Sequence, residues 1–227
     1  MDIQLNYVEQ GTGFPLVLLH GNSGDHTYFE HQMGPFSARF RVIGVDTRGH
    51  GGSPRGEAPF TLDQFARDLK EFLDGLGIQK CHLLGFSDGG NIALLFALRH
   101  PEYISKLILN GANLDPSGVK RTTQLPIELG WASLKVMSHF DPKAQSKLEK
   151  MELMVHQPNI SLLELRKLRL PTLVVAGDRD MIKESHTRAI SASIPTSRMV
   201  ILPGSHFLAR ENCEAFNSLV LEFLEKG

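Results

Sequence analysis

The segment Gly85-Phe86-Ser87-Asp88-Gly89 constrains the fold of this chain most strongly, because it joins two kinds of secondary structure. The apolar run that ends at Leu84 is short enough for a buried strand, and residues 91–98 favour a helix. The turn between them must be sharp, and the two glycines leave room for a strained serine backbone. This Gly-x-Ser-x-Gly pattern predicts that the Ser87 hydroxyl points out of a sheet, beside the positive end of a helix.

A serine hydrolyses substrates only when a base, a group that orients the base and donors for the oxyanion surround it. His206 is the predicted base, because it lies in a loop between the strand-like residues 198–203 and the last helix. Its predicted partner is Asp180, in the carboxylate-rich turn after the apolar run that begins at residue 172. Asp178 in the same turn is the alternative partner.

Four parts of the chain resemble the motifs of the α/β-hydrolase fold family, in the order in which the family has them. They are residues 18–22, residues 45–53, the turn around Ser87, and the late loops at 177–180 and 204–206. The order serine, aspartate, histidine is also that of the family. The resemblance implies that the catalytic acid is the last residue of the Gly-x-x-Asp turn, which is Asp180.

The resemblance further implies that the backbone N–H groups of Asn22 and Asp88 form the oxyanion hole. We expect structural roles for two nearby histidines. His20 precedes a glycine at a strand end and is expected to order the oxyanion loop, and His50 is expected to hold a tight loop through hydrogen bonds.

The carboxylate of Asp88 directly follows the predicted nucleophile, in a cleft where an unpaired charge is unfavourable. The turn around Ser87 and the helix after it resemble those of the valacyclovir hydrolase branch, also called biphenyl-hydrolase-like. In that branch the corresponding aspartate holds the ammonium group of α-amino-acid esters. The alternative is that Asp88 only stabilises the first turn of its helix.

Short apolar runs alternate with helical patterns along the chain, which predicts an α/β fold with a doubly wound, mostly parallel sheet. One helix is expected to begin after Thr61, whose side chain can cap it. The strands are expected near residues 3–9, 15–20, 41–46, 80–86, 105–111, 171–177 and 198–203.

Residues 113–168 interrupt this alternation with helical patterns that we expect to be broken at Pro116, Pro126, Pro142 and Pro158. We therefore predict a helical lid here, inserted into a single domain whose core is residues 1–112 and 169–227. Family insertions at this point fold over the serine. Trp131 is a candidate substrate-binding residue, together with three lid methionines, although such residues at helical spacing also form the core of a lid. The methionines are Met137, Met151 and Met154.

The composition fits one large core, with 227 residues of which 41% are hydrophobic. A formal net charge of -1 provides no excess of basic residues for nucleic acid. No apolar run approaches the length of a membrane span, and the first residues lack the pattern of a signal peptide, so we expect a cytoplasmic protein without membrane contact. Cys81 and Cys213 are expected to be separate buried thiols, and no motif calls for a metal ion or a cofactor.

The sequence thus predicts a serine hydrolase that cleaves a small carboxylic ester through an acyl-enzyme, with α-amino-acid esters as the more specific possibility. Carbon–carbon bond hydrolysis of the meta-cleavage type is an alternative, because the same fold and side chains serve it. A second alternative is a ligand-binding receptor that keeps the three side chains for slow turnover.

Overall fold

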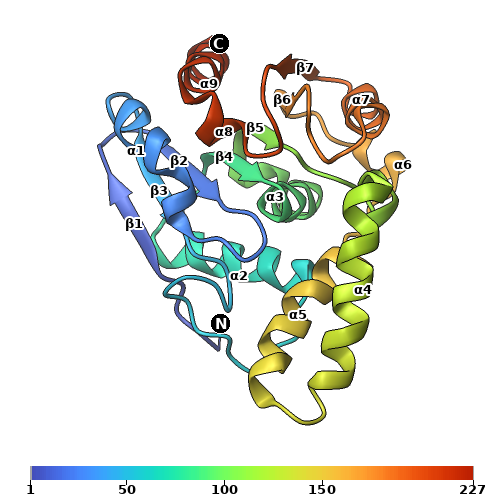
Figure 1. Ribbon diagram of the computed structural model, residues 1–227. Coiled ribbons are helices and arrows are strands. Elements are labelled where there is room, and N and C mark those ends of the chain that lie inside the picture. The colour runs from blue at the N-terminus through green and yellow to red at the C-terminus, as the bar shows by residue number, and fades with distance from the viewer. Residues whose placement is uncertain (1, 227) are drawn as a thin grey trace.

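A single seven-stranded sheet organises the fold, in the order β1-β3-β2-β4-β5-β6-β7 (Figure 1). The computed structural model describes residues 2–226, apart from the side chains of residues 142 and 143. The edge strand β1 runs antiparallel to β3, and the other neighbouring strands are parallel. The strands are β1 (Tyr7–Gln10), β2 (Pro15–Leu19), β3 (Arg41–Val45), β4 (Cys81–Phe86), β5 (Ile104–Asn110), β6 (Thr172–Gly177) and β7 (Ser197–Leu202).

Helices cover both faces of this sheet, which confirms the doubly wound α/β fold (Figure 1). Alternate strand residues face opposite sides: Val17 and Leu19 pack with α2, α3 and α7, whereas Leu16 and Leu18 pack with α1, α8 and α9. The helices are η1 (His26–Phe29), α1 (Glu30–Ser37), α2 (Leu62–Gly75), α3 (Asp88–Arg99), η2 (Pro101–Tyr103), η3 (Pro116–Gly118), α4 (Arg121–Met137), α5 (Pro142–His156), α6 (Leu162–Leu165), α7 (Glu184–Ser193), α8 (Leu208–Glu211) and α9 (Cys213–Glu225).

The expected strands are all present, and the main difference lies at the first one. Pairing begins at Tyr7, opposite Val45 at the end of β3, so residues 3–6 are not part of the strand as predicted. The helix expected after Thr61 is α2, and the Thr61 hydroxyl accepts a hydrogen bond from the Gln64 N–H at 3.1 Å. Cys81 is buried as expected, whereas Cys213 at the start of α9 is only partly buried.

The segment predicted to be the lid, residues 113–168, contains η3, α4, α5 and α6. Its long helices α4 and α5 pack together and project from the core as a hairpin (Figure 1). Pro116 and Pro142 begin helices and Pro158 follows one, but the expectation that Pro126 breaks the helical pattern is wrong. Pro126 removes one backbone hydrogen bond near the start of α4, and packing against α5 holds the rest of that helix.

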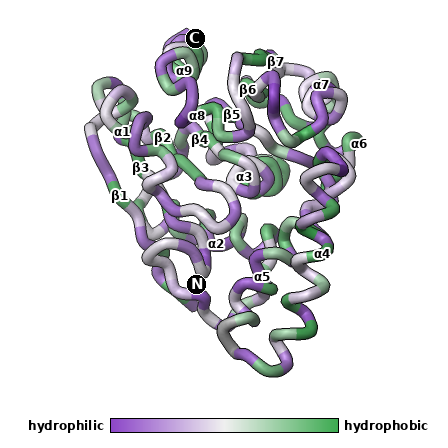
Figure 2. The backbone as a smooth tube through the Cα atoms, in the orientation of Figure 1, coloured by the Kyte–Doolittle hydropathy of each residue, from purple (hydrophilic) through white to green (hydrophobic). Residues whose placement is uncertain are grey.

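Hydrophobic and hydrophilic residues alternate along α4 and α5 (Figure 2). Several large apolar side chains of α4 remain exposed, among them Leu129 and Val136. Within the described chain, none of the helices combines the length and hydropathy needed to cross a lipid bilayer.

Candidate active site

The turn around Ser87 connects β4 to α3 through a strained backbone. Ser87 has φ 53° and ψ -120°, and it is one of two non-glycine residues with positive φ in the described chain. A Cβ atom at Gly85 would collide with the carbonyl oxygen of Gly89, and one at Gly89 would collide with that of Leu19. The two glycines therefore allow the close packing of strand, turn and helix that raises the serine above the sheet edge.

Ser87, His206 and Asp180 form a continuous chain of hydrogen bonds. The Nε2 atom of His206 lies 2.9 Å from Ser87 Oγ, and its Nδ1 atom lies 2.7 Å from Asp180 Oδ1. The same carboxylate oxygen accepts the Ile182 N–H at 2.9 Å. His206 and Asp180 are buried, so their contact is shielded from water. In this geometry the aspartate favours the tautomer that carries the proton on Nδ1 and leaves Nε2 free to accept the serine proton.

Asp178, the alternative acid, has a different position. Its Oδ1 atom accepts the Gly204 N–H at 2.9 Å, and its side chain is exposed. This contact joins the turn after β6 to the loop that carries His206. Asp178 thereby supports the loop, while Asp180 contacts the imidazole.

The loop after β2 lies directly against Ser87. A Cβ atom added to Gly21 would lie 3.0 Å from the Ser87 Cβ atom, so this position accepts only glycine without a shift of the backbone. Asn22 follows in this loop, and Asp88 is the first residue of α3. Among the described residues, no hydrogen bond occupies the backbone N–H of either one. The first N–H groups of a helix have no partner within the helix and are available to an anion.

The Asp88 side chain is buried beside Ser87 and has amide partners. It accepts hydrogen bonds from Asn22 Nδ2 at 2.9 Å and from Asn91 Nδ2 at 3.4 Å. Burial raises the pKa of the Asp88 carboxyl, and the hydrogen bond from Asn22 partly opposes this. No ion pair with Asp88 occurs in the described part of the chain. Burial therefore disfavours the charged form of this carboxyl group.

The side chain of Asn22 also joins the core to α5. Its Nδ2 atom donates to the backbone oxygen of Lys150 at 2.9 Å, in addition to Asp88. A second link is the ion pair between Arg55 and Glu149, with a shortest distance of 2.7 Å. These side-chain contacts were not anticipated from the sequence, because the position of α5 depends on the packing of the whole hairpin.

A pocket lies over Ser87 and Asp88, between the core and residues 113–168. Its cavity is about 30 Å³, comparable to the space of one water molecule. Two flexible side chains, Met154 and Met181, form part of its wall. The other lining residues are Asn113, Val119, Gln124, Ile127, Gln157 and Ile182.

Trp131, the expected substrate-binding residue, does not line this pocket. It borders a separate groove on the projecting hairpin with Lys135, Val136 and Phe140, and its ring contacts that of His156 at 5.0 Å between centroids. Met137 is exposed, and of the three lid methionines Met154 contributes to the pocket wall.

His20 and His50 have the structural contacts that we expected. His20 Nδ1 lies 2.7 Å from the Gly21 oxygen, and its Nε2 atom accepts the Thr47 N–H at 3.0 Å. His50 Nδ1 lies 2.9 Å from the Arg48 oxygen. Burial lowers the pKa of both histidines, to about 3 for His50, so both are neutral at physiological pH.

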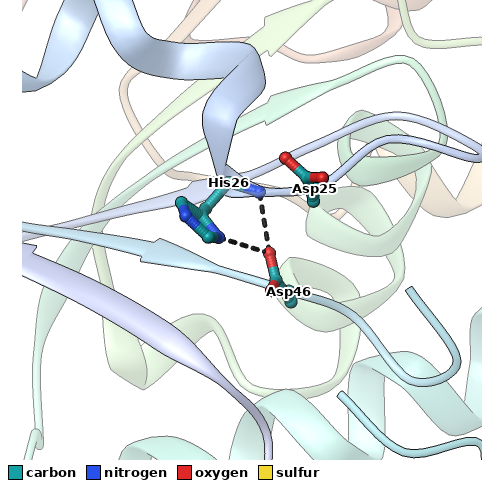
Figure 3. Close-up of side chains that lie close together, drawn as sticks. All are labelled: Asp25, His26 and Asp46. Carbon is teal, nitrogen blue, oxygen red and sulfur yellow. Dashed lines mark hydrogen bonds and ion pairs between the residues drawn. The ribbon is translucent and has the colours of Figure 1, made fainter. Parts of the chain in front are cut away.

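Asp46 forms hydrogen bonds with neighbouring loops, and His26 and Asp25 lie beside it (Figure 3). Its Oδ1 atom accepts the backbone N–H and the Nδ1 atom of His26, at 2.7 and 2.8 Å, and its Oδ2 atom accepts from Asn6 and Gly52. Asp25 instead caps η1 through the Thr27 N–H. Each oxygen of Asp46 already has two protein donors, so we assign this cluster a structural role rather than metal binding.

A buried ion pair fixes the same loop from the other side. The guanidinium of Arg48 donates to both oxygens of Asp68 at 2.7 Å, and these two side chains are 0% and 1% exposed. Arg48 also contacts Asp2, at 2.6 Å. The pair connects the loop that contains His50 to α2, which lies behind the candidate site.

Comparison with known proteins agrees with the fold. A family model of the alpha/beta hydrolase fold matches residues 15–135. Human serine hydrolase BPHL is 30% identical over 247 aligned positions, which cover 98% of this chain and 84% of the human protein. A 2-hydroxy-6-oxononadienedioate/2-hydroxy-6-oxononatrienedioate hydrolase from Comamonas testosteroni is 30% identical and covers 99% of this chain and 92% of its own length.

Among solved structures, a hydrolase from Pseudomonas aeruginosa PA01 superimposes with a TM-score of 0.80 at 26% identity, over 99% of this chain and 95% of that chain. The expected resemblance to the biphenyl-hydrolase-like branch is confirmed by the match to the human protein. The chain belongs to the alpha/beta hydrolase fold family.

Proposed function

We propose that this protein is a serine hydrolase that cleaves a small carboxylic ester through an acyl-enzyme intermediate. The observation that carries this proposal is the hydrogen-bonded chain from Ser87 Oγ through His206 to Asp180. A serine hydroxyl is a weak nucleophile by itself, and a neighbouring imidazole held by a buried carboxylate activates it.

In the proposed first step, Ser87 Oγ forms a bond to the ester carbonyl carbon while His206 Nε2 takes the hydroxyl proton. Asp180 stabilises the imidazolium that results. The tetrahedral intermediate then breaks its bond to the alcohol, which leaves with the proton from His206. In the second step a water molecule gives a proton to His206 and attacks the acyl carbon, and the acid is released as Ser87 regains its proton.

The negative oxygen of each tetrahedral intermediate needs donors in place before the reaction. We assign this role to the backbone N–H groups of Asn22 and Asp88, because both belong to segments that adjoin Ser87 and neither has another acceptor in the described chain. One such donor typically contributes about 3 to 4 kcal/mol to transition-state stabilisation.

Asp88 supports a narrower substrate class, the α-amino-acid esters. Its carboxylate is buried and lines the pocket. Among the described residues, only side-chain amides donate hydrogen bonds to it. A substrate ammonium would supply the positive charge that balances the Asp88 carboxylate, which is shielded from water. The helix-capping role remains compatible with this, since Asp88 is also the first residue of α3.

Carbon–carbon bond hydrolysis is the second candidate, and the relative from Comamonas testosteroni favours it. The name of that relative's substrate describes a dicarboxylate. Asp88 would repel a carboxylate of such a substrate that enters the pocket, and none of the described pocket residues is basic. We therefore place ester hydrolysis first.

Turnover of p-nitrophenyl acetate and butyrate tests the proposed reaction. Sustained release of nitrophenol that disappears in Ser87→Ala is expected. One equivalent of release without further turnover would instead identify a receptor or an enzyme that does not deacylate. Faster turnover of dienoic ring-fission compounds than of any ester would favour carbon–carbon hydrolysis.

The ammonium assignment has its own test, which compares an α-aminoacyl ester with its des-amino analogue. The wild type should prefer the amine in kcat/KM, and Asp88→Asn should abolish that preference. A preference that persists in Asp88→Asn would assign Asp88 to the helix terminus alone.

A further inference from the structure

Gln124 has a buried amide oxygen without a hydrogen-bond partner. It stands in the second turn of α4, lines the pocket with Ser87 and Asp88, and is 5% exposed. Its Oε1 atom is inaccessible to solvent and accepts no hydrogen bond from any described residue. A buried acceptor without a donor destabilises a folded protein, so such atoms call for an explanation.

The contact of the Gln124 Nε2 atom determines the orientation of this amide. The Nε2 atom of Gln124 lies 3.5 Å from the backbone oxygen of Met154 on α5. A reversed amide would bring two acceptors together at that place, which is unfavourable. The oxygen therefore points away from Met154.

The other two amide oxygens of the pocket wall already have donors. Gln157 Oε1 accepts the Leu62 N–H at 2.9 Å, at the start of α2. Asn113 Oδ1 accepts from Asn91 Nδ2 at 3.0 Å. Among the three amides of the described pocket wall, Gln124 is thus the one whose oxygen has no hydrogen-bond donor.

Asp88 contributes a second acceptor to the same pocket. Its described hydrogen bonds come from Asn22 and Asn91, the latter at the long distance of 3.4 Å, whereas a carboxylate has room for about four donors. A free amide oxygen and an underused carboxylate in one pocket fit a group that carries several N–H donors and a positive charge. A primary ammonium has three such donors and no acceptor.

We propose that Gln124 Oε1 and the Asp88 carboxylate bind the substrate ammonium together, which makes Gln124 a specificity-determining residue for α-amino-acid esters. This inference rests on the proposed ester hydrolysis. Asp88 is the first residue of α3 in the core and Gln124 belongs to α4, so the bound ammonium would contact both parts of the chain.

The test measures kcat/KM for an α-aminoacyl ester and for its des-amino analogue, and uses the ratio of the two. Gln124→Met keeps the length of the side chain but cannot accept this hydrogen bond. The ratio is expected to fall about tenfold or more, the usual effect of one hydrogen bond to a charged group.

Gln157→Met is the matched control, because it makes the same chemical change at an amide that already has a donor. Its ratio should stay at the wild-type value. An unchanged ratio in Gln124→Met, or a loss shared equally by Gln124→Met and Gln157→Met, would overturn the role of Gln124. The absence of a preference for the amine in the wild type would overturn it as well.

The controls also separate this inference from the proposed function. If Ser87→Ala hydrolyses both esters as fast as the wild type, the proposed reaction itself is wrong. If Ser87 is required and Asp88→Asn loses the preference while Gln124→Met keeps it, only the assignment of Gln124 fails.

Discussion

Replacing Arg48 with methionine tests how the loop behind the candidate site is stabilised. The guanidinium forms two hydrogen bonds of 2.7 Å with Asp68, and both side chains are buried. In Arg48→Met the Asp68 carboxylate keeps the amide of Gln64, at 3.0 Å, but loses its positive partner. Removal of one member of a buried pair typically lowers the free energy of unfolding by about 3 to 5 kcal/mol.

Arg41 offers a matched control, since it contacts Glu9 with the same two-bond geometry at 2.9 and 2.8 Å. That pair is partly exposed at the sheet edge, so Arg41→Met should lower the free energy of unfolding by about 1 kcal/mol or less. Arg48 also donates to Asp2 and to the backbone oxygen of Arg55, so the comparison sets a buried network of hydrogen bonds against a partly exposed pair.

Urea unfolding followed by circular dichroism measures these differences. The double variant Arg48→Met/Asp68→Leu removes both buried charges and should recover most of the stability lost in Arg48→Met. A loss below about 1 kcal/mol in Arg48→Met, or a double variant no more stable than the single one, would show that the buried pair does not stabilise this loop in the expected way.

Three further predictions concern the candidate site. Asp180→Asn should lower kcat by about 10⁴-fold, because the imidazole then no longer holds the required tautomer. Asp178→Asn should retain most of the wild-type kcat. Steady-state kinetics with an ester substrate distinguish the two variants. Burial lowers the pKa of His50 in the folded protein to about 3, below its unfolded value of about 6.5, so the free energy of unfolding should fall as the pH drops from about 6.5 toward 3. The expected loss at pH 4.5 is about 2 to 3 kcal/mol. A urea midpoint in His50→Gln with the same pH dependence as in the wild type would contradict this. Gly89→Ala should unfold at lower urea than the wild type, because its Cβ atom would meet the Leu19 carbonyl oxygen, and equal midpoints would count against that contact.

The sequence was informative wherever the signal was local. The strands could be predicted because short apolar runs lie between turn residues, and the turn around Ser87 because its glycines meet steric demands that the structure makes visible. The pairing of His206 with Asp180 spans 26 residues and was predicted from the order of family motifs. Periodicity alone does not specify such a contact.

Features that depend on tertiary packing could not be predicted in the same way. Pro126 remains inside α4 because packing against α5 supports that helix. Trp131 borders a separate groove because the orientation of α4 and α5 relative to the core places it there. Gln124 is an ordinary polar residue in the sequence, and its free oxygen becomes apparent only beside Met154 and Asp88. The partnership of Arg48 and Asp68 likewise joins a loop to a helix that packs behind it.

In the proposed reaction, His206 makes the Ser87 hydroxyl reactive. Reaction with a fluorophosphonate at neutral pH, followed by peptide mapping, measures this directly. One covalent adduct is expected on Ser87, absent from Ser87→Ala and formed much more slowly in His206→Ala. An adduct on a different serine, or a rate at Ser87 that is the same without His206, would contradict it.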